Sequence, residues 1–272
     1  MKIPRGLQPL IDEGMVDAVL RQLKSGKEAS VFLVQCGREL RCAKVYKDAE
    51  HRGFHKLAQY QEGRKARGSR DARAMQNGSS RHGRRQQEEE WKNAEVEALY
   101  KLHYAGVRVP RPVSNYAGVL LMELVQDAEG NPAPRLNDVT PSAEQARAWH
   151  GFMMRQIVLM LCAGLIHGDL SEYNVLIDKD GPVIIDLPQA VSAASNNNAF
   201  AMLERDVNNM RASFGRAAPD LLDTQYAREI WALFQNSTLK PDSALTGQFV
   251  DESASADVGA VLNQIEEARR EQ

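Results

Sequence analysis

Apolar residues recur along this chain with two different spacings, and each spacing predicts a different kind of element. Over residues 7–24 they return every three or four positions, which favours an amphipathic helix. Two short apolar runs follow, Val31–Val34 and Leu40–Tyr46, on either side of the turn Cys36–Glu39. Their β-branched residues and the glycine in the turn predict a β-hairpin. A further apolar strand is expected over Gly118–Leu124.

Helical spacing dominates the second half of the chain. Pro141 opens the longest stretch of this kind, and Ser142 or Thr140 supplies its N-cap. Strands thus concentrate in the first half and helices in the second, which predicts an α+β fold of two unequal lobes, 1–122 and 126–272, with a cleft between them. The expected helices cover about 86–104, 142–163, 199–215, 219–235 and 255–270.

The composition is that of an ordinary globular protein. Of 272 residues, 43% are hydrophobic and 26% are charged. The formal net charge of -2 gives no reason to expect a nucleic acid or a membrane as a partner of the whole chain. The N-terminus lacks a signal-peptide core, and no run of about eighteen apolar residues occurs, so no membrane partner is expected. Cys36, Cys42 and Cys162 form no C-x-x-C pair, so we expect reduced, buried thiols in a cytoplasmic protein.

One internal segment departs from this balance. Residues 48–90 are rich in Arg, Lys, His, Gln and Gly and poor in aliphatic residues, and the part over 48–85 is basic. Such a composition favours a loop or a disordered segment over a packed element. Its positive charge would also suit contact with RNA phosphates, for example on a ribosome. A solvated loop and an RNA-binding loop both stay open at this point.

The strongest candidate chemistry lies at Asp169, Asn174 and Asp186. Asn174 follows Asp169 by five residues, and Asp186 follows Asn174 by twelve. The last two adjoin short apolar runs typical of strands, joined by a turn at Asp178–Gly181. Each residue alone would be an ordinary turn or capping residue. Together they supply what phosphoryl transfer with Mg²⁺ needs: one carboxylate for the hydroxyl proton, and two oxygen ligands that hold the metal on the phosphates.

A lysine and a glutamate are expected to complete this site. Alternation along the returning strand puts Cys42, Lys44 and Tyr46 on one face, an unusual place for a solvated charge. Lys44 could reach phosphate oxygens there, and it would need a carboxylate to hold it. Glu95 is the best candidate because it falls on the apolar stripe of the helix over 86–104. The alternatives are a lysine directed to solvent and a surface glutamate.

Two further segments could contact a nucleotide. The turn Ser25-Gly26-Lys27-Glu28-Ala29-Ser30 is not a Walker A loop, but it lies one hairpin before Lys44. It could present backbone N–H groups and two serine hydroxyls to phosphates. The strand over 118–124 exits through Glu123 to Val125, where a linker between lobes would expose backbone groups to a planar base.

On these residues the chain resembles the RIO family of atypical protein kinases, most closely its RIO1 type, over about residues 10–235. The family has a bilobal protein-kinase-like fold, with a β-rich N-lobe and a mainly helical C-lobe. The matching stretches are Ser25-Gly26-Lys27-Glu28-Ala29-Ser30-Val31, Ala43-Lys44-Val45-Tyr46-Lys47, Trp91 with Glu95 ahead of Ala105-Gly106-Val107, Leu121-Met122-Glu123, His167-Gly168-Asp169-Leu170-Ser171-Glu172-Tyr173-Asn174, Ile185-Asp186, Leu203-Glu204-Arg205-Asp206-Val207 and Tyr226-Ala227-Arg228-Glu229.

The resemblance implies an ATP- and Mg²⁺-dependent serine/threonine protein kinase, with Mn²⁺ as an alternative ion. Its protein substrate is unknown, and autophosphorylation is expected. Asp169 would be the catalytic base, and Asn174 and Asp186 would bind the metal. Lys44 would hold the ATP phosphates and pair with Glu95.

The resemblance also assigns the nucleotide contacts. The turn over 25–30 would cover the triphosphate, Met122 would lie behind the adenine, and backbone groups of Glu123 and Val125 would contact it. The metal-binding aspartate of this family can itself accept a phosphoryl group. Asp186 is therefore also a candidate aspartyl-phosphate site, which would give the protein ATPase activity.

Two other functions stay open. A small-molecule phosphotransferase of the aminoglycoside or choline kinase type also resembles the His-Gly-Asp-x-x-x-x-Asn pattern followed by Ile-Asp. The turn over 25–30, the Lys44-Val45-Tyr46-Lys47 run and the lack of a long acidic insert count against it. The second is an RNA-binding or ribosome-assembly factor that uses ATP as a conformational switch and contacts RNA through 48–85.

Overall fold

The computed structural model of the chain describes residues 3–26, 29–47 and 81–250. The elements of the first half are η1 (Arg5–Leu7), α1 (Gln8–Asp12), β1 (Ala18–Ser25), β2 (Ala29–Cys36), β3 (Glu39–Tyr46), α4 (Arg81–Tyr104), β4 (Pro112–Tyr116) and β5 (Val119–Glu123). The elements of the second half are η3 (Leu136–Asp138), α5 (Ala143–Cys162), β6 (Leu165–Ile166), β7 (Val175–Asp178), β8 (Gly181–Ile184), β9 (Val191–Ser192), α6 (Ala199–Gly215), η4 (Pro219–Asp223) and α7 (Tyr226–Gln235).

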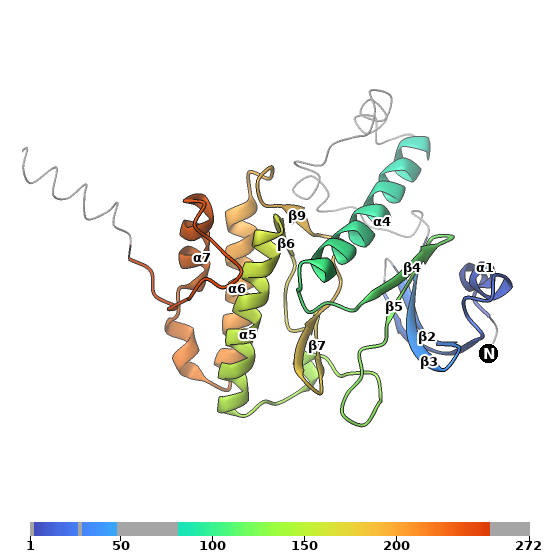
Figure 1. Ribbon diagram of the computed structural model, residues 1–272, viewed down its shortest axis with the longest axis horizontal. Helices are drawn as coiled ribbons and strands as arrows, with labels where there is room; N and C mark the ends of the chain where they lie inside the picture. The colour runs from blue at the N-terminus through green and yellow to red at the C-terminus, as the bar shows by residue number, and fades with distance from the viewer. Residues whose placement is uncertain (1–2, 27–28, 48–80, 251–272) are drawn as a thin grey trace, which may run out of the picture.

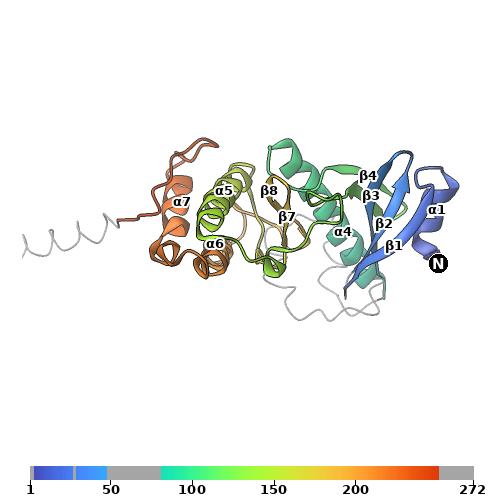
Figure 2. The ribbon, with the colours of Figure 1, turned by 90° about the horizontal axis from the view of Figure 1, so that it is seen from below.

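The described part of the chain is elongated, with a β-sheet at one end and helices at the other (Figure 1). A view turned by 90° shows the same succession along the long axis: α1, the sheet, α4, the β7–β8 pair, and then α5, α6 and α7 (Figure 2). The small β7–β8 pair therefore lies between the two ends of the molecule. We call the sheet with α1 and α4 the N-lobe, and the elements from η3 onward the C-lobe.

The N-lobe sheet has five antiparallel strands in the order β1-β2-β3-β5-β4. Its register places Lys44 of β3 opposite Val31 of β2 and Leu120 of β5. Alternation gives the sheet two different faces. The face turned away from the C-lobe packs against Leu7 and Leu10 through Phe32, Val34, Ala43, Val119 and Leu121. Lys44 therefore lies on the opposite face, as the alternation predicted.

A single apolar core links the two lobes. Leu99 and Leu102 of α4 belong to the same cluster of buried side chains as Leu120 of β5 and Met153 and Ile157 of α5. Because α4 contributes to this core, its position is fixed by contacts on both sides of the cleft. Glu95, one turn before Leu99, is therefore carried on a helix that is itself held in place.

The cap predicted for α5 is present. The Ser142 side chain accepts from the Gln145 backbone N–H at 3.1 Å, and the Gln145 side chain accepts from the Ser142 N–H at 3.0 Å. This reciprocal capping box satisfies two N–H groups that the first turn of a helix leaves without a backbone partner. The structure thus selects Ser142 over Thr140.

Residues 7–24 differ from their prediction, because α1 ends at Asp12 and the chain continues as β1. Gly14 lies between them with a φ of 67°, which L side chains rarely adopt. The register of β1 with β2 shifts after Val19 and again after Gln22. These irregularities break the period of two that a regular strand would show, so the apolar spacing resembled that of a helix.

Two other helices have different limits from those predicted. The range 219–235 is divided into η4 and α7, since Thr224 between them is extended with a ψ of 148°. Helix α4 begins at Arg81, before the expected 86. The expected helix over 255–270 lies outside the described residues, as does most of the basic segment, residues 48–80.

The predicted α+β fold, with strands first and helices second, is confirmed; the division into 1–122 and 126–272 stays a prediction. In the described ranges no helix has both the length and the hydropathy to cross a bilayer. The three cysteines are free thiols. Cys42 is buried as predicted and Cys36 is partly buried, but the prediction is wrong for Cys162, which is exposed at the end of α5.

Candidate active site

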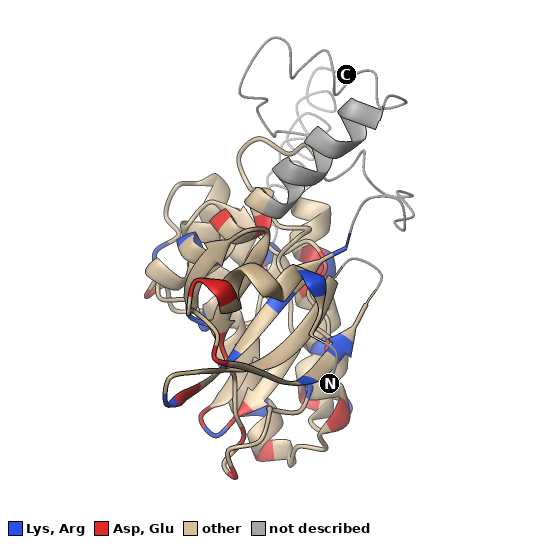
Figure 3. Cartoon of the chain, turned by 90° about the vertical axis from the view of Figure 1, so that its right-hand side faces the viewer, with Lys and Arg blue, Asp and Glu red and all other residues tan. Residues whose placement is uncertain are grey.

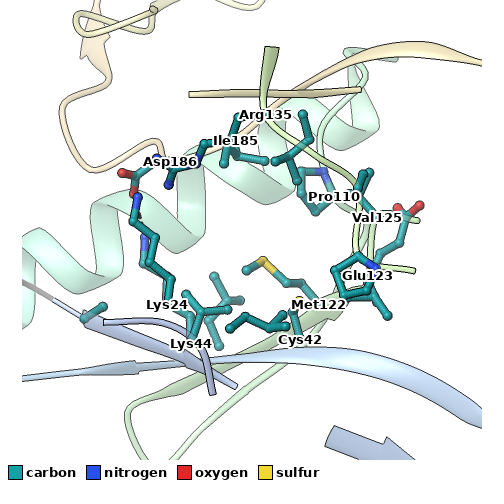
Figure 4. Close-up of a pocket in the computed structure, with 18 of the residues that line it drawn as sticks. Lys24, Cys42, Lys44, Pro110, Met122, Glu123, Val125, Arg135, Ile185 and Asp186 are labelled. Atoms are coloured by element: carbon teal, nitrogen blue, oxygen red, sulfur yellow. Dashed lines mark hydrogen bonds and ion pairs between the residues drawn. The ribbon is translucent and has the colours of Figure 1, made fainter. Parts of the chain in front are cut away.

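A cavity of about 870 Å³ separates the inner face of the N-lobe sheet from the β7–β8 pair. Its two ends differ chemically. Lys44 and Asp186 lie at one end, whereas Glu123 and Val125 lie at the other (Figure 4). Between them the walls are mainly apolar, with Arg135 as a charged exception: Val31, Leu120 and Met122 come from the sheet, and Leu176 and Ile185 come from the β7–β8 region. The volume and the uneven distribution of charge suit a ligand with a flat apolar part and a charged part.

Lys44 is the centre of the charged end. Its side chain is only 10% exposed, and Nζ donates to Oε1 of Glu95 and, at 2.8 Å, to Oδ1 of Asp186. Glu95 is in turn fixed by the Tyr46 hydroxyl, which donates to Oε2 at 2.8 Å. Strand β3, helix α4 and the segment after β8 thus meet at one ammonium group. The sequence predicted the pairing of Lys44 with Glu95, and the structure adds Asp186 and Tyr46.

Charged neighbours determine the ionisation of Lys44 and Asp186 in this cluster. Burial opposes the charge on Lys44, but Glu95 and Asp186 outweigh it and hold the pKa of Lys44 above its ordinary value. Desolvation likewise opposes the charge on Asp186, yet the Lys44 charge and hydrogen bond hold the pKa of Asp186 below its ordinary value. Burial and the neighbouring Glu95 raise the pKa of Tyr46. The cluster therefore contains a lysine cation, a carboxylate at Asp186 and a neutral phenol near neutral pH.

The loop 167–174, which carries Asp169, is held by α6 from behind. The Asp206 carboxylate accepts from the backbone N–H groups of Gly168 at 2.8 Å and Leu170 at 2.9 Å. Arg205 donates to the Gly168 carbonyl, and Asn209 donates to the Leu170 carbonyl at 2.8 Å. Backbone groups on both sides of Asp169 are thus occupied, whereas the Asp169 side chain is exposed. This arrangement fixes the backbone of the loop and leaves the Asp169 carboxylate open to solvent.

Asp206 holds this loop, although the sequence reasoning gave it no role. It is 2% exposed, and burial raises its pKa to about 6, although His167, the two backbone N–H groups and Arg205 act in the opposite direction. A signal was available: Asp206 lies on the buried stripe of α6 with Leu203, Val207 and Met210. A carboxylate on an apolar helix face needs polar partners, and here those partners are loop backbone groups.

His167 ties the loop to the segment before Asp186. Its Nδ1 accepts from the Asp169 N–H at 3.3 Å, and its Nε2 lies 3.1 Å from the Ile185 carbonyl. The Nε2 contact is a hydrogen bond when Nε2 carries a proton. The backbone N–H of Ile185 donates to the Asn174 carbonyl at 3.0 Å, so the residues before Asp186 are bonded to both ends of the loop.

The predicted metal ligands are consistent with Mg²⁺ bound in part by a nucleotide. The Asn174 amide donates to the Asp169 carbonyl at 2.9 Å, which leaves its oxygen as the ligand atom. Asp186 is 44% exposed at the side chain and has a left-handed φ of 69°. No cluster of three His, Cys, Asp or Glu able to hold an ion occurs in the part of the chain that the structure describes. One carboxylate and one amide fit Mg²⁺ with phosphate oxygens as further ligands, and Mg²⁺ would polarise those phosphates.

Part of the turn over 25–30 lies at the charged end of the cavity, near Lys44. Gly26 and Ala29 line the cavity, and the Gly26 N–H donates to the Ala29 carbonyl at 2.9 Å. The Ser25 and Ser30 hydroxyls lie 3.3 Å apart. Lys27 and Glu28, also predicted as nucleotide contacts, lie outside the described residues.

Lys47 was not predicted as a site residue, although the sequence pattern included it. Its Nζ donates to Ser25 Oγ at 3.0 Å and to the Gly26 carbonyl at 2.6 Å. Lys47 thereby fastens the start of the turn to the end of β3.

Comparison with known proteins agrees with this geometry. The family model described as RIO domain matches residues 30–227. A relative in Haloferax volcanii, named RIO-type serine/threonine-protein kinase Rio1, is 34% identical over 78% of this chain and 68% of its own length. The relative of the same name in Methanocaldococcus jannaschii is 32% identical, over 73% of this chain and 63% of its own length.

Eukaryotic relatives are longer. The human serine/threonine-protein kinase RIO1 is 25% identical over 76% of this chain, but the match covers only 35% of the human protein. The match therefore gives no information on the function of those additional regions. The family match covers most of the described residues, including Lys44, Glu95, Asp169 and Asp186. The chain belongs to the RIO family, whose relatives in archaea and eukaryotes are named as serine/threonine protein kinases.

Proposed function

We propose that this chain is a RIO-type serine/threonine protein kinase that uses ATP with Mg²⁺, or with Mn²⁺ as an alternative ion. The observation that carries the proposal is the Lys44 cluster. A buried lysine bonded to Glu95 and Asp186 lies at the charged end of a cavity whose middle is apolar. Such a lysine can transfer one of its hydrogen bonds to a phosphate oxygen without losing its structural carboxylate.

The roles follow from the positions of the side chains. Asp169 accepts or orients the proton of the substrate hydroxyl, because its carboxylate is exposed on a loop whose backbone is fixed. Asn174 and Asp186 hold the metal, and Lys44 neutralises charge on the phosphates. The Gly26 and Ala29 region covers the phosphates from above.

The base of the nucleotide is assigned to the other end of the cavity. Met122 lines the wall there, behind the space for a planar ring (Figure 4). The Val125 carbonyl already accepts from the Ala133 N–H at 2.9 Å, and the Glu123 N–H donates to the Arg111 carbonyl at 2.9 Å. An adenine would therefore be recognised through the Glu123 carbonyl and the Val125 N–H.

Asp186 is also proposed as a transient phosphoryl acceptor. A carboxylate oxygen would attack the γ-phosphorus, ADP would leave with the bridging oxygen, and water would later cleave the acyl phosphate to release phosphate. The 44% exposure of the Asp186 side chain gives a phosphoryl group access to it. Repetition of these two steps amounts to ATPase turnover.

Transfer of labelled phosphate from ATP in the presence of Mg²⁺ tests the proposal. Asp169→Asn should abolish transfer to serine or threonine and leave nucleotide binding intact, since the base acts only in the chemical step. Asp186→Ala should remove the Mg²⁺ dependence of nucleotide binding. Hydroxylamine should release label held on Asp186 but not label on serine. Wild-type protein that neither binds nor hydrolyses Mg·ATP would refute the proposal.

The alternative functions are not favoured by the comparisons, whose relatives are RIO kinases rather than small-molecule phosphotransferases. Lys, Arg, Asp and Glu are interspersed over the described part of the N-lobe end (Figure 3). RNA or ribosome contact would therefore depend on 48–85, and salt-dependent RNA binding would test it. We propose a cytoplasmic location, which suits three free thiols, and a protein substrate that includes the chain itself through autophosphorylation.

A further inference from the structure

Arg108 lies where the N-lobe meets the β7–β8 pair. Its guanidinium binds Glu123 with two hydrogen bonds, Nη2 to Oε1 at 3.1 Å and Nη1 to Oε2 at 3.3 Å. The same Nη2 donates to Asp178 Oδ2 at 2.6 Å. One arginine thus joins the end of β5 to the end of β7, over a sequence separation of 55 residues between the two acids.

The backbone of Arg108 is fixed separately on the C-lobe. Its N–H donates to Oε1 of Gln156 in α5 at 2.7 Å, and its carbonyl accepts from the Ile184 N–H of β8 at 2.9 Å. Although residue 108 falls between α4 and β4 in the sequence, it is bonded to C-lobe elements. The bonds from its side chain to Glu123 therefore cross from the C-lobe to the strand that leads into the linker.

The two acids bind the same Nη2, so Asp178 lies beside Glu123, and the β7–β8 pair connects this point to the phosphate end of the nucleotide site. Glu123 lines the cavity where the base is assigned, next to Val125. Asp178 ends β7, which begins directly after Asn174, and β8 leads back to Asp186. Asp178 also holds the hairpin turn, because Oδ1 accepts from the N–H groups of Asp180 at 2.7 Å and Gly181 at 2.9 Å.

The burial of this cluster distinguishes it from a surface ion pair. The side chains of Asp178, Glu123 and Arg108 are 7%, 29% and 32% exposed. Arg147 and Asp220 form a similarly multidentate pair on the C-lobe surface, but they are 51% and 55% exposed. Exposed pairs contribute little, whereas a partly buried cluster with several hydrogen bonds can hold two elements in register.

We propose that Arg108 is a positioning residue that fixes the linker over 123–125 relative to the β7–β8 pair, and so sets the separation between the base and phosphate ends of the nucleotide site. The inference rests on the proposed function of the cavity as a Mg·ATP site. A ligand that occupies both ends depends on this separation, and a ligand that occupies only the base end does not.

Calorimetric binding of two ligands, adenosine and the non-hydrolysable ATP analogue AMP-PNP with Mg²⁺, tests the inference. Arg108→Gln and Asp178→Asn should each weaken Mg·AMP-PNP binding by about 3- to 30-fold and leave adenosine binding unchanged. The double variant should lose less than the product of the two single losses, because both substitutions break one cluster. Thermal unfolding should show that each variant is folded at the temperature of the titration.

Arg147→Gln is the matched control and should leave both affinities unchanged. Equal weakening of both ligands by Arg108→Gln, or no effect on Mg·AMP-PNP, would overturn the inference. Should Arg108→Gln fail to fold, Asp178→Asn decides alone, since an asparagine keeps an oxygen for the hairpin turn. Wild-type protein that binds neither ligand would instead refute the proposed function, so the two failures are distinguishable.

Discussion

Lys44 and Asp206 are buried ionisable residues on opposite sides of the cleft, and their surroundings shift their ionisation in opposite senses. Lys44 has two carboxylates within hydrogen-bond distance, and its pKa shifts toward the charged form. Asp206 accepts from two backbone N–H groups, and its pKa shifts toward the neutral form. A full opposite charge at contact distance outweighs desolvation, whereas peptide dipoles and more distant charges do not. On the N-lobe side, two carboxylates thus stabilise a buried lysine cation. On the C-lobe side, a carboxylate whose burial is unfavourable holds the backbone of the loop 167–174.

Lys44→Met should have the largest effect on stability, because it removes the buried cation and leaves Glu95 without its counter-charge. Breaking a buried pair on one side costs about 3–5 kcal/mol of unfolding free energy. Urea denaturation measures this loss of unfolding free energy. Adding Glu95→Gln to Lys44→Met should restore part of the lost stability; an additive further loss would contradict the assignment of charge pairing. Phosphoryl transfer should be lost in both variants.

Asp206→Asn should change the pH dependence of stability. Asp206 has a pKa of about 6 when folded and an ordinary value of 3.8. Between these values the folded protein retains a proton that the unfolded chain has released, so the stability contributed by this group falls as pH rises. The stability of the wild type relative to Asp206→Asn should fall by about 3 kcal/mol between pH 4 and pH 6 and then stay level. Urea midpoints across this range measure it, and parallel curves for the two proteins would contradict the assignment.

Tyr46→Phe separates the hydrogen bond to Glu95 from the ion pair. The hydroxyl donates to one carboxylate oxygen, and Lys44 binds the other. Loss of a buried hydrogen bond to a charged group should cost about 1.5–3 kcal/mol in thermal or urea unfolding. The same substitution in a Glu95→Gln background should cost less. An equal cost in both backgrounds would show that the charge of Glu95 does not contribute.

Lys47→Met should have the smallest effect, and it should be confined to nucleotide binding. Lys47 fastens Ser25 and Gly26 from an incompletely buried position, so global stability should change little. The KM for ATP should rise a few-fold with kcat nearly unchanged, because only the cover of the phosphates becomes looser. Lys47→Arg, which can still donate to both groups, serves as the control. A fall in kcat at constant KM would contradict a role limited to the turn.

Local chemistry explains which features could be predicted from the sequence. The alternation around Lys44 predicted its face, the Ser142 cap is a short-range motif, and the spacing of Asp169, Asn174 and Asp186 belongs to one loop and one hairpin. These features depend on residues close together in the chain. The strand β1 was missed because its register with β2 shifts twice, and such irregularities arise only from pairing.

Long-range contacts explain what could not be predicted in the site. Arg108 contacts Asp178 across 70 residues, and Asp206 reaches Gly168 across 38. Neither pairing has a local periodic signal. For Asp206 an acid on an apolar helix stripe indicated a buried partner without identifying it. The Lys44–Glu95 pair was predictable because Lys44 lies on the less polar strand face and Glu95 on an apolar helix stripe, and both residues also lie in patterns of the RIO family.

Asp186 adopts a left-handed backbone with a φ of 69°, a conformation that glycine adopts without the penalty that a Cβ introduces. This backbone penalty opposes the stability that the ion pair of Asp186 with Lys44 contributes. Substitution of Asp186 by glycine would remove the penalty, the ion pair and the carboxylate that phosphoryl transfer needs. The backbone angle marks in advance where stability and activity cannot be improved together.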